Sequence, residues 1–300
     1  MSVAKIMVLG GTGMLGHKMF QVLRQQFSGV FCTVRHDIRK SPFDLVQLLQ
    51  GNDVVQGVNV SDFAALRATL SAFRPEFIIN CVGVIKQRTE ATSAIPCIAI
   101  NSLLPHTLAE MASGWGGRVI YFSTDCVFSG KKGSYVEEDC SDAEDLYGRS
   151  KYLGEVVGEN ALTLRTSIIG RELREHRSLL DWFLSQNHKT VRGFRKVIYS
   201  GVTTNHLAEQ IASILLRYPS LNGLYQVASE PISKFNLLHL LGEAYELDIL
   251  IEPDDQEVSD RSMRCDRLSD AIGYKCPPWP DLVRQLANDI TPYGKWLDQR

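Results

Sequence analysis

The chain has 300 residues, of which 44% are hydrophobic and 22% charged, and its formal net charge is −2. This composition is that of an ordinary globular protein, and the small net charge gives no reason to expect a nucleic-acid or anionic-membrane partner. No apolar run reaches the roughly 18 residues that span a bilayer. The N-terminal apolar segment lacks a cleavage region, so we expect a cytoplasmic protein that does not contact membranes.

The seven cysteines are odd in number and include no C-x-x-C pair, and Cys32 and Cys81 fall inside apolar runs that predict strands. Buried free thiols in a reducing compartment fit this pattern best. The histidines show no H-x-x-x-H spacing, so the sequence predicts no metal site.

A glycine-rich stretch follows the first apolar run. Residues 3–9 lead directly into Gly10-Gly-Thr-Gly-Met-Leu-Gly16, after which apolar residues recur at helical spacing. A strand, a glycine-rich turn and a helix in this order are typical of dinucleotide binding. Gly10 permits the sharp turn, Gly13 lets a pyrophosphate approach the backbone, and Gly16 lets the helix pack on the strand. The helix N-terminus then offers free N–H groups to the phosphates.

The strand–helix pattern repeats about five times. Further strands are predicted at 30–34, 54–58, 77–81, 118–122 and 162–166, with helices at 41–51, 63–73, around Asn101 and from Tyr147 to about Gly158. Pro105 is expected to kink the helix that contains Asn101. Such alternation predicts a doubly wound parallel α/β sheet with a dinucleotide at its carboxyl edge.

The end of the second strand bears on the choice of cofactor. Enzymes selective for NAD usually carry Asp or Glu there, bonded to the ribose 2′-hydroxyl. This strand ends instead in Arg35, with Arg39 close behind. A guanidinium suits a 2′-phosphate, so we favour NADPH. Asp37 is near enough to leave NADH open, and a simply solvated Arg35 is the alternative interpretation.

The fifth strand is followed by Ser123, Thr124 and Asp125, small polar residues placed at the ligand edge of an open sheet. Further on, Tyr147 and Lys151 stand four residues apart, which puts both side chains on one face of a helix. A lysine ammonium beside a phenol is expected to lower the phenol's pKa and to prepare it for proton transfer. The alternative is a surface tyrosine beside a solvated lysine.

The pattern loosens after residue 166. Helices are predicted at 178–186, 204–218 and 233–247, strands at 223–228 and 247–252, and a last helix after Pro277-Pro-Trp-Pro280. We assign residues 1–165 to an NADP(H)-binding Rossmann domain, completed by a later segment near 192–220. Residues 166–300, mainly 166–191 and 223–300, form a smaller α/β substrate domain. Trp279 is expected to be a packing residue.

Taken together, these motifs resemble an extended short-chain dehydrogenase/reductase. They are the stretches 10–16, 80–83, 123–130 and 147–155, with Asn101 between them. Within that superfamily the chain resembles the dTDP-4-dehydrorhamnose reductase group of nucleotide-sugar 4-ketoreductases. The hallmark of the group is Ser123-Thr-Asp-x-Val-Phe-x-Gly130. The resemblance is strong over residues 3–170 and weaker beyond.

The resemblance implies roles for individual residues. Tyr147 donates a proton to the C4 keto oxygen as hydride arrives from the nicotinamide, Lys151 holds the nicotinamide ribose, and Thr124 bonds the same keto oxygen. Asn101 supports this catalytic trio. The expected cofactor-binding residues are Gly10, Thr12, Gly13, Met14, Leu15, Gly16, Arg35, Asn59, Val60, Cys81, Val82, Gly83, Asn101, Tyr147 and Lys151. The expected substrate-binding residues are Val84, Lys86, Thr124, Asp125, Cys126 and Arg195.

Three departures from the group concern the sugar and the adenine. Cys126 stands where the rhamnose enzymes usually carry Tyr, residues 84–87 replace an acidic loop, and Asn59 replaces an aspartate expected near the adenine. The prediction is therefore NADPH-dependent reduction of a nucleotide-linked 4-keto-6-deoxy sugar for cell-surface polysaccharide precursors, with dTDP and UDP sugars both open. Candidates for the diphosphate, by charge alone, are Arg171, Arg195, Lys234, Arg261 and Arg264.

Two other functions use the same scaffold. Epimerases and dehydratases also employ Tyr and Lys but keep NAD(H) tightly bound, whereas Arg35 favours an exchangeable NADP(H). A non-catalytic, NADP-binding regulatory subunit is the second alternative, because a relative of this group binds methionine adenosyltransferase. The intact trio of Thr124, Tyr147 and Lys151 argues against pure binding. A homodimer is a further partner left open.

Overall fold

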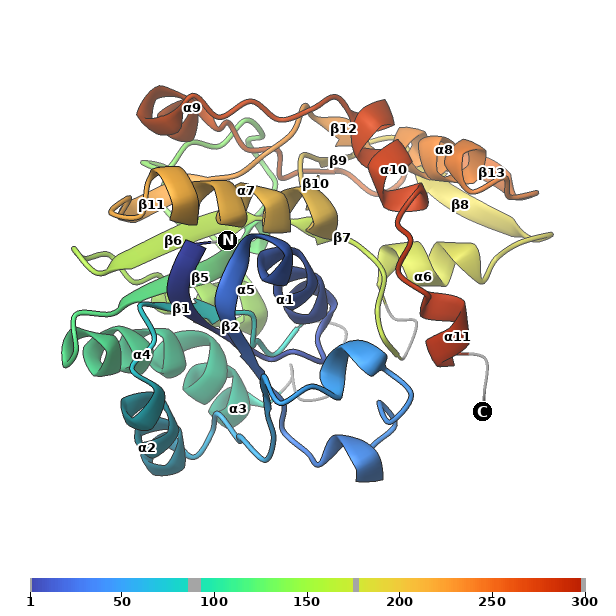
Figure 1. Cartoon of the computed structure of the whole chain (residues 1–300). Helices are drawn as coiled ribbons and strands as arrows, with labels where there is room; N and C mark the ends of the chain where they lie inside the picture. Colours follow the sequence, from blue (N-terminus) through green and yellow to red (C-terminus); the bar gives the residue numbers. More distant parts are fainter. Residues whose placement is uncertain (1, 86–92, 175–177, 298–300) are drawn as a thin grey trace.

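A seven-stranded parallel sheet is the largest element of the computed structural model, which describes residues 2–85, 93–174 and 178–297 (Figure 1). Its strand order is β11-β6-β5-β4-β1-β2-β3. These strands are β1 (Ser2–Leu9), β2 (Phe27–Thr33), β3 (Val54–Val55), β4 (Phe77–Asn80), β5 (Arg118–Thr124), β6 (Ala161–Thr166) and β11 (Gly223–Gln226). The chain adds β2 and β3 on one side of β1 and the other four strands on its opposite side. This change of side at β1 is the switch point of a doubly wound fold, so the predicted fold class is confirmed.

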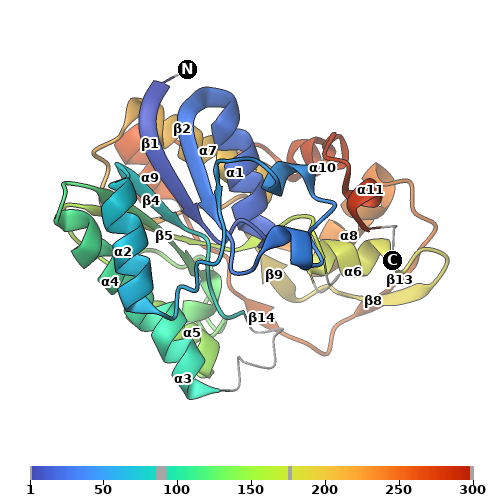
Figure 2. The same ribbon diagram turned by 60° about the horizontal axis from the view of Figure 1, so that its bottom comes forward.

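Helices cover both faces of this sheet (Figure 2). One face carries α1 (Met14–Gln26) and α7 (Thr204–Arg217), and the other carries α2 (Phe63–Phe73) and α4 (Leu104–Ser113). The helix before α4 is continuous with it and comprises α3 (Ala94–Cys97) and a π-helical segment, Ile98–Leu103. Next in the chain after β5 comes α5 (Leu146–Leu153).

The central strands carry uninterrupted apolar runs because both of their faces are buried. In β1, Ile6 and Val8 pack in the core under α1 and α7, while Met7 and Leu9 pack in the core under α2 and α4. Successive side chains of a strand point to opposite faces, so an uninterrupted apolar run fits a sheet with helices on both sides.

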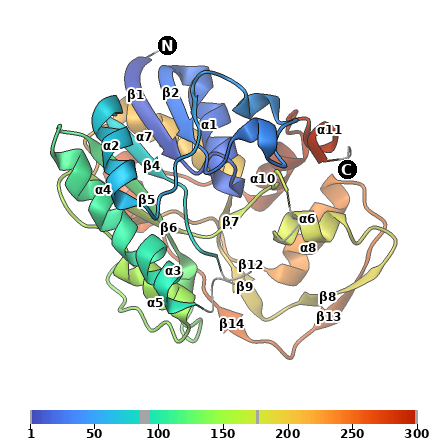
Figure 3. The same ribbon diagram turned by 90° about the horizontal axis from the view of Figure 1, so that it is seen from below.

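The C-terminal part of the chain forms a smaller layered unit beside the sheet, on the side away from α2 and α4 (Figure 3). Its strands pair as β10-β7, β12-β9-β14 and β13-β8. They are β7 (Ile168–Ile169), β8 (Thr190–Phe194), β9 (Val197–Tyr199), β10 (Val202–Thr203), β12 (Ile232–Ser233), β13 (Leu250–Asp254) and β14 (Ser259–Asp260). The helices are α6 (Leu179–Leu184), α8 (Lys234–Ala244), α9 (Asp266–Ile272), α10 (Trp279–Ala287) and α11 (Tyr293–Leu297).

Trp279, the first residue of α10, is buried in the hydrophobic core of the smaller unit with side chains of α6 and α8. Its indole N–H donates to the Glu230 carbonyl at 2.8 Å. It is a packing residue, as expected. The domain boundaries stay a prediction, and β11 belongs to the large sheet although the sequence places residues 223–300 with the substrate domain.

Four local predictions were wrong in whole or in part. Residues 41–51 do not form a helix but turns between the short 3₁₀ segments Ile38–Lys40 and Gln47–Leu49, because Pro42 disfavours helical backbone at Ser41. α5 ends at Leu153 instead of near Gly158, and β13 lies three residues later than expected. The last two helices begin at Trp279 and Tyr293, so the proline-rich run belongs partly to α10.

Within the described ranges, no helix is both long and apolar enough to cross a membrane. The same residues hold no group of three or more His, Cys, Asp or Glu side chains that could bind a metal ion.

Candidate active site

The glycine-rich turn lies where β1, α1 and the end of β4 meet. Gly10 has a φ of +86°, a backbone conformation that favours glycine. A Cβ at Gly16 would lie 2.0 Å from the Gly10 carbonyl oxygen, so only glycine lets α1 pack this closely on the turn. A Cβ at Gly10 would lie 2.8 Å from the Val82 side chain. Residues 10–16 and 81–83 are therefore neighbours, as the motif predicts, and α1 begins at Met14 without a side-chain cap at Gly13.

The side chains of Arg35 and Asp37, which bear on the choice between NADPH and NADH, follow the end of β2. The Asp37 carboxylate caps the segment Ile38–Lys40 by accepting the Arg39 backbone N–H at 3.0 Å. Arg35 is exposed one residue beyond Val34. One oxygen of the carboxylate that left NADH open is thus bonded to the local backbone. Farther along, Asn59 is exposed and its side-chain oxygen accepts the Ser61 N–H at 3.2 Å, while Val60 is half-buried.

Thr124, Tyr147 and Lys151 come together at the carboxyl end of β5. Thr124 is the last residue of that strand, and α5 presents Tyr147 and Lys151 from one face. The Thr124 hydroxyl donates to the Asp125 carboxylate at 3.1 Å and lies close enough to the Tyr147 phenol to act on its pKa. The Lys151 ammonium donates to the Phe122 carbonyl at 2.5 Å and lies 4.1 Å from the centroid of the Tyr121 ring.

Two glycines let α5 approach this strand end, and the sequence reading gave them no role. A Cβ at Gly148 would lie 2.1 Å from the Cys126 carbonyl oxygen, and one at Gly154 would lie 1.9 Å from the Asn101 carbonyl oxygen. In the sequence, this close packing could have been inferred from two glycines that stand six residues apart on either side of Lys151. Asp145 caps the helix by accepting the Gly148 N–H at 2.8 Å.

The protonation states differ from the expectation that Lys151 lowers the pKa of Tyr147. Burial raises the pKa of the Tyr147 phenol, and repulsion from ionised Cys126 and Asp125 raises it further. The interaction with Thr124 lowers this pKa only in part. Burial also lowers the pKa of Lys151 to about 7, against the charge of Glu155. The expectation was wrong because the ammonium is directed to the Phe122 carbonyl and the Tyr121 ring.

Asn101 is fully buried in the π-helical segment and fastens the loop after β4 to α5. Its side chain accepts the Val84 N–H at 2.9 Å and donates to the Val84 carbonyl at 3.0 Å and to Ser150 at 3.1 Å. Its own carbonyl accepts the Tyr121 hydroxyl at 2.9 Å. Asn101 therefore orders the backbone around the trio, which agrees with a supporting role.

A buried ion pair beneath the trio was not anticipated. Arg165 on β6 makes two hydrogen bonds of 2.8 Å to Glu155, and Ser123 donates to the same carboxylate at 2.6 Å. The side chains of Arg165 and Glu155 are only 3% and 5% exposed. Such a paired fork holds geometry well. It ties β5, β6 and the end of α5 together and places a negative charge near Lys151.

The expected substrate residues divide into those near the trio and those elsewhere. Asp125 is buried next to Thr124, and burial raises the pKa of its carboxyl against the charge of Arg261 and hydrogen bonds from Thr124, Cys126 and Ser167. Cys126 is half-buried, and burial with the nearby Asp125 charge raises the pKa of its thiol to about 12. Val84 lies buried beside Asn101.

Arg195, by contrast, is exposed and forms an ion pair with Asp255. Lys86 lies outside the described residues. Among the diphosphate candidates, Arg171 pairs with Asp181 and Arg264 with Asp266, while Arg261 is the arginine whose charge acts on Asp125.

A family model described as the RmlD substrate binding domain matches residues 4–290. The chain belongs to this family. Among curated relatives, it is 24% identical over 266 residues to methionine adenosyltransferase 2 subunit beta of Xenopus tropicalis, covering 81% of this chain and 72% of that one. It is 23% identical over 239 residues to the spore coat polysaccharide biosynthesis protein SpsK of Bacillus subtilis, covering 77% and 75%.

Among solved structures, dTDP-4-dehydrorhamnose reductase from Bacillus anthracis in complex with NADP superimposes with a TM-score of 0.77 at 18% identity, covering 94% of this chain and 98% of that one. At this identity the likeness shows the fold. The resemblance deduced from the motifs, an extended short-chain dehydrogenase/reductase fold of the RmlD kind, is confirmed.

Replacing Arg165 by Met should lower the free energy of unfolding by about 3–5 kcal/mol, because the Glu155 carboxylate is left buried and unpaired. Arg67→Met is the matched control, since Arg67 pairs with Glu110 on the surface at 3.1 Å with side chains 51% and 72% exposed. That control should change stability by no more than about 0.5 kcal/mol. Urea unfolding measures both, and equal losses would contradict the structural role of the buried pair.

Proposed function

We propose that this protein uses NADPH to reduce the C4 keto group of a nucleotide-linked 4-keto-6-deoxy sugar. The observation that carries the proposal is the meeting of Thr124, Tyr147 and Lys151 at the carboxyl end of β5. The glycine-rich turn lies at the same edge of the sheet, where ligands of open α/β sheets bind.

The protonation of Tyr147 suits the direction of reduction. A phenol with a raised pKa is fully protonated near neutral pH and can give its proton to the oxygen atom that becomes an alkoxide. When bound, the reduced nicotinamide supplies the hydride. Thr124, whose hydroxyl donates to the Asp125 carboxylate at 3.1 Å in the free protein, is proposed to orient the keto oxygen, and the charged form of Lys151 is proposed to hold the nicotinamide ribose.

Arg35 and the glycine-rich turn support a cofactor with a 2′-phosphate. The turn and the free N-terminus of α1 suit a pyrophosphate. Arg35 is exposed at the end of β2, and the competing carboxylate of Asp37 is occupied as a cap. NADPH is therefore the proposed cofactor. The solved relative from Bacillus anthracis is a complex with NADP, which agrees with this choice.

The sugar is proposed by class only. Cys126, Asp125 and Val84 are the described residues proposed to contact it, with Arg261, the diphosphate candidate whose charge acts on Asp125, beside them. The relative SpsK is named for polysaccharide biosynthesis, which favours a role in cell-surface precursors.

A non-catalytic regulatory subunit is the second candidate, because relatives named methionine adenosyltransferase 2 subunit beta match 81% of this chain. An epimerase or dehydratase on the same scaffold is the third. Asp125 is the one carboxylate next to Thr124, and Cys126 follows it where a second acid would be expected in a dehydratase.

A homodimer in the cytoplasm stays a prediction. Exposed apolar side chains gather on α3, the π-helical segment and α5, and these elements contact one another. They are Ile95, Ile98, Leu103, Tyr152, Leu153 and Val157. This face is a suitable place for a second copy to bind.

The proposal is tested by following NADPH oxidation at 340 nm. Dehydratases would generate 4-keto-6-deoxy sugars from dTDP-glucose and from UDP-N-acetylglucosamine, with and without epimerisation at C5. Oxidation with one family of sugars and not the other would fix both the reaction and the substrate class. Tight NADPH binding without oxidation of any sugar would favour the regulatory subunit. Tyr147→Phe is the control, and it should lower turnover by about 10²–10⁴-fold with NADPH affinity nearly intact.

Arg35→Ala should weaken the binding of NADPH by about tenfold or more, because a charge-assisted hydrogen bond to the 2′-phosphate is lost. The affinity for NADH, which lacks this phosphate, should stay nearly unchanged. Titration of each reduced cofactor, followed by its fluorescence, measures the two dissociation constants. Arg67→Ala, which removes an exposed arginine of α2 that pairs with Glu110, is the matched control. Equal losses of affinity for NADPH and NADH would refute the role of Arg35 at the 2′-phosphate.

The pH profile should reflect Lys151. Its pKa near 7 lies below the usual value, so the ammonium is present below pH 7 and is lost as the pH rises through that value. Tyr147 keeps its proton throughout, because its pKa is raised. The kcat/KM for NADPH should therefore fall above pH of about 7 along a single alkaline limb. A constant kcat/KM between pH 6 and 9 would contradict this assignment.

A further inference from the structure

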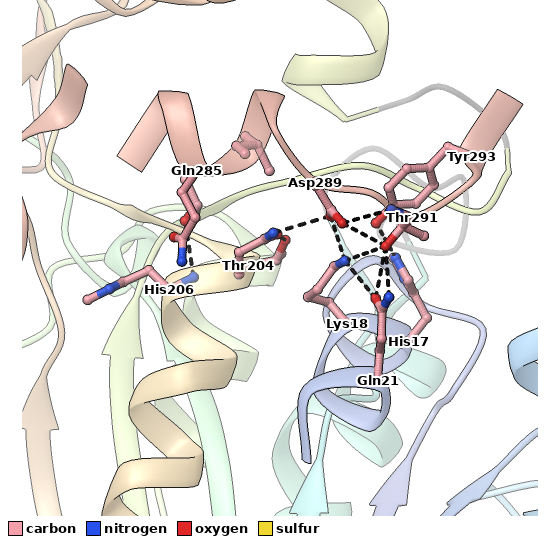
Figure 4. Close-up of polar contacts among 12 residues, drawn as sticks. His17, Lys18, Gln21, Thr204, His206, Gln285, Asp289, Thr291 and Tyr293 are labelled. Atoms are coloured by element: carbon pink, nitrogen blue, oxygen red, sulfur yellow. Dashed lines mark hydrogen bonds and ion pairs between the residues drawn. The ribbon is translucent and has the colours of Figure 1, made fainter. Parts of the chain in front are cut away.

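A second cluster of buried polar side chains lies away from the trio, between α1 and the C-terminal segment, defined here as residues 289–297 (Figure 4). His17 and Lys18 follow the glycine-rich turn in α1 and are 0% and 2% exposed. Both meet side chains more than 270 positions away in the sequence. The catalytic trio makes no use of them, so their burial needs another explanation.

The hydrogen bonds of His17 determine its tautomer. Its Nδ1 lies 2.8 Å from the Gly13 carbonyl oxygen, which can only accept, so Nδ1 carries the proton. Its Nε2 lies 2.9 Å from the Tyr293 hydroxyl and must then accept from it. Burial lowers the pKa of His17 to about 4, which keeps the ring neutral near pH 7. A directed chain therefore runs from Tyr293 through His17 to the glycine-rich turn.

The Gly13 carbonyl belongs to the same peptide unit as the Met14 N–H. That unit is planar and trans, so its C=O and N–H point in opposite directions. The bond from His17 holds the carbonyl toward the helix, together with the His17 backbone N–H at 3.1 Å. The Met14 N–H is thereby aimed out of the helix N-terminus, where such groups bind phosphate.

Tyr293 is itself held in place by a buried ion pair. Lys18 lies 2.6 Å from the Asp289 carboxylate, with side chains 3% and 8% exposed, and also donates to Thr291 at 3.0 Å. Asn205, from α7, donates to the same carboxylate at 3.2 Å. The C-terminal segment is thus bonded to both helices on this face of the sheet, and Figure 4 shows these side chains converging.

We propose that His17 is a positioning residue for the pyrophosphate-binding turn and that Tyr293 of the C-terminal segment fixes its orientation. Cofactor affinity then depends on residues 289–293, far along the chain from the glycine motif. The proposal deepens the proposed function and rests on it for the identity of the ligand. It adds a determinant of dinucleotide binding that the glycine motif alone does not contain.

The chain offers a matched control pair. His206 on α7 lies 3.1 Å through its Nε2 from the Tyr274 hydroxyl, and both residues are buried to the same degree as His17 and Tyr293. Burial lowers the pKa of His206 to about 4 as well. This pair joins α7 to the residues after α9 and not to the glycine-rich turn. Tyr274→Phe therefore removes the same kind of bond without touching the proposed chain.

The test compares Tyr293→Phe with Tyr274→Phe in the full-length protein. Thermal unfolding should show similar small losses for both. Tyr293→Phe alone should raise the dissociation constant of NADPH by about five- to tenfold, because the cofactor must then also order the turn that the Tyr293–His17 bond held in place. In cofactor-free protein, Tyr293→Phe alone should speed hydrogen exchange of the peptide that contains residues 10–17. Equal effects of the two variants on affinity and on exchange would overturn the proposal.

A double variant separates positioning from general destabilisation. If Tyr293 acts through His17, then Tyr293→Phe should add no further loss of NADPH affinity in a His17→Ala background. Additive losses would refute the chain of bonds. Should the wild-type protein bind no nicotinamide cofactor, the proposed function fails, and the exchange comparison without cofactor still decides whether His17 and Tyr293 order the turn.

Discussion

The close approach of α5 to the end of β5 is the constraint on which the candidate active site depends. Gly148 and Gly154 allow the helix to lie against the Cys126 and Asn101 carbonyls, and neither position has room for a Cβ. The Lys151 ammonium then reaches the Phe122 carbonyl, and the Tyr147 side chain reaches Thr124. Because the Glu155–Arg165 pair fastens the far end of the helix to β6, the trio is held by packing and by charge together.

Burial at this point sets the chemistry as much as proximity does. Removing Tyr147 and Lys151 from water disfavours both the phenolate and the ammonium, so the phenol keeps its proton and the lysine becomes easy to deprotonate. A site in this state is prepared to donate a proton to a developing alkoxide. The expectation of an acidified phenol placed the lysine beside the hydroxyl, whereas the ammonium is fixed to the strand backbone.

Sequence reasoning located the sheet, the glycine-rich turn and the trio because each has a local signature. The apolar runs have lengths that suit strands, and Tyr147 and Lys151 share a helix, so spacing alone places them together. It failed where contacts join distant segments. The Glu155–Arg165 pair and the bonds of Lys18 with Asp289 depend on which strands and helices become neighbours, and no spacing reveals them. Residues 41–51 failed for a local reason, since their apolar residues mimic a helix that Pro42 interrupts.

The cost of the buried polar groups bears on the choice between catalysis and pure binding. A lysine and a tyrosine at the end of β5, both desolvated, lower stability relative to apolar residues of similar size. A surface that served only to bind a partner would gain nothing from that cost, since the trio lies inside the fold, with Thr124 and Lys151 buried. Proton transfer to a carbonyl oxygen, in contrast, gains from a protonated donor that is positioned at the reacting atom and shielded from water. The proposed reduction would account for that cost, since it needs both a dinucleotide at the glycine-rich turn, where His17 bonds the Gly13 carbonyl, and a proton donor such as Tyr147.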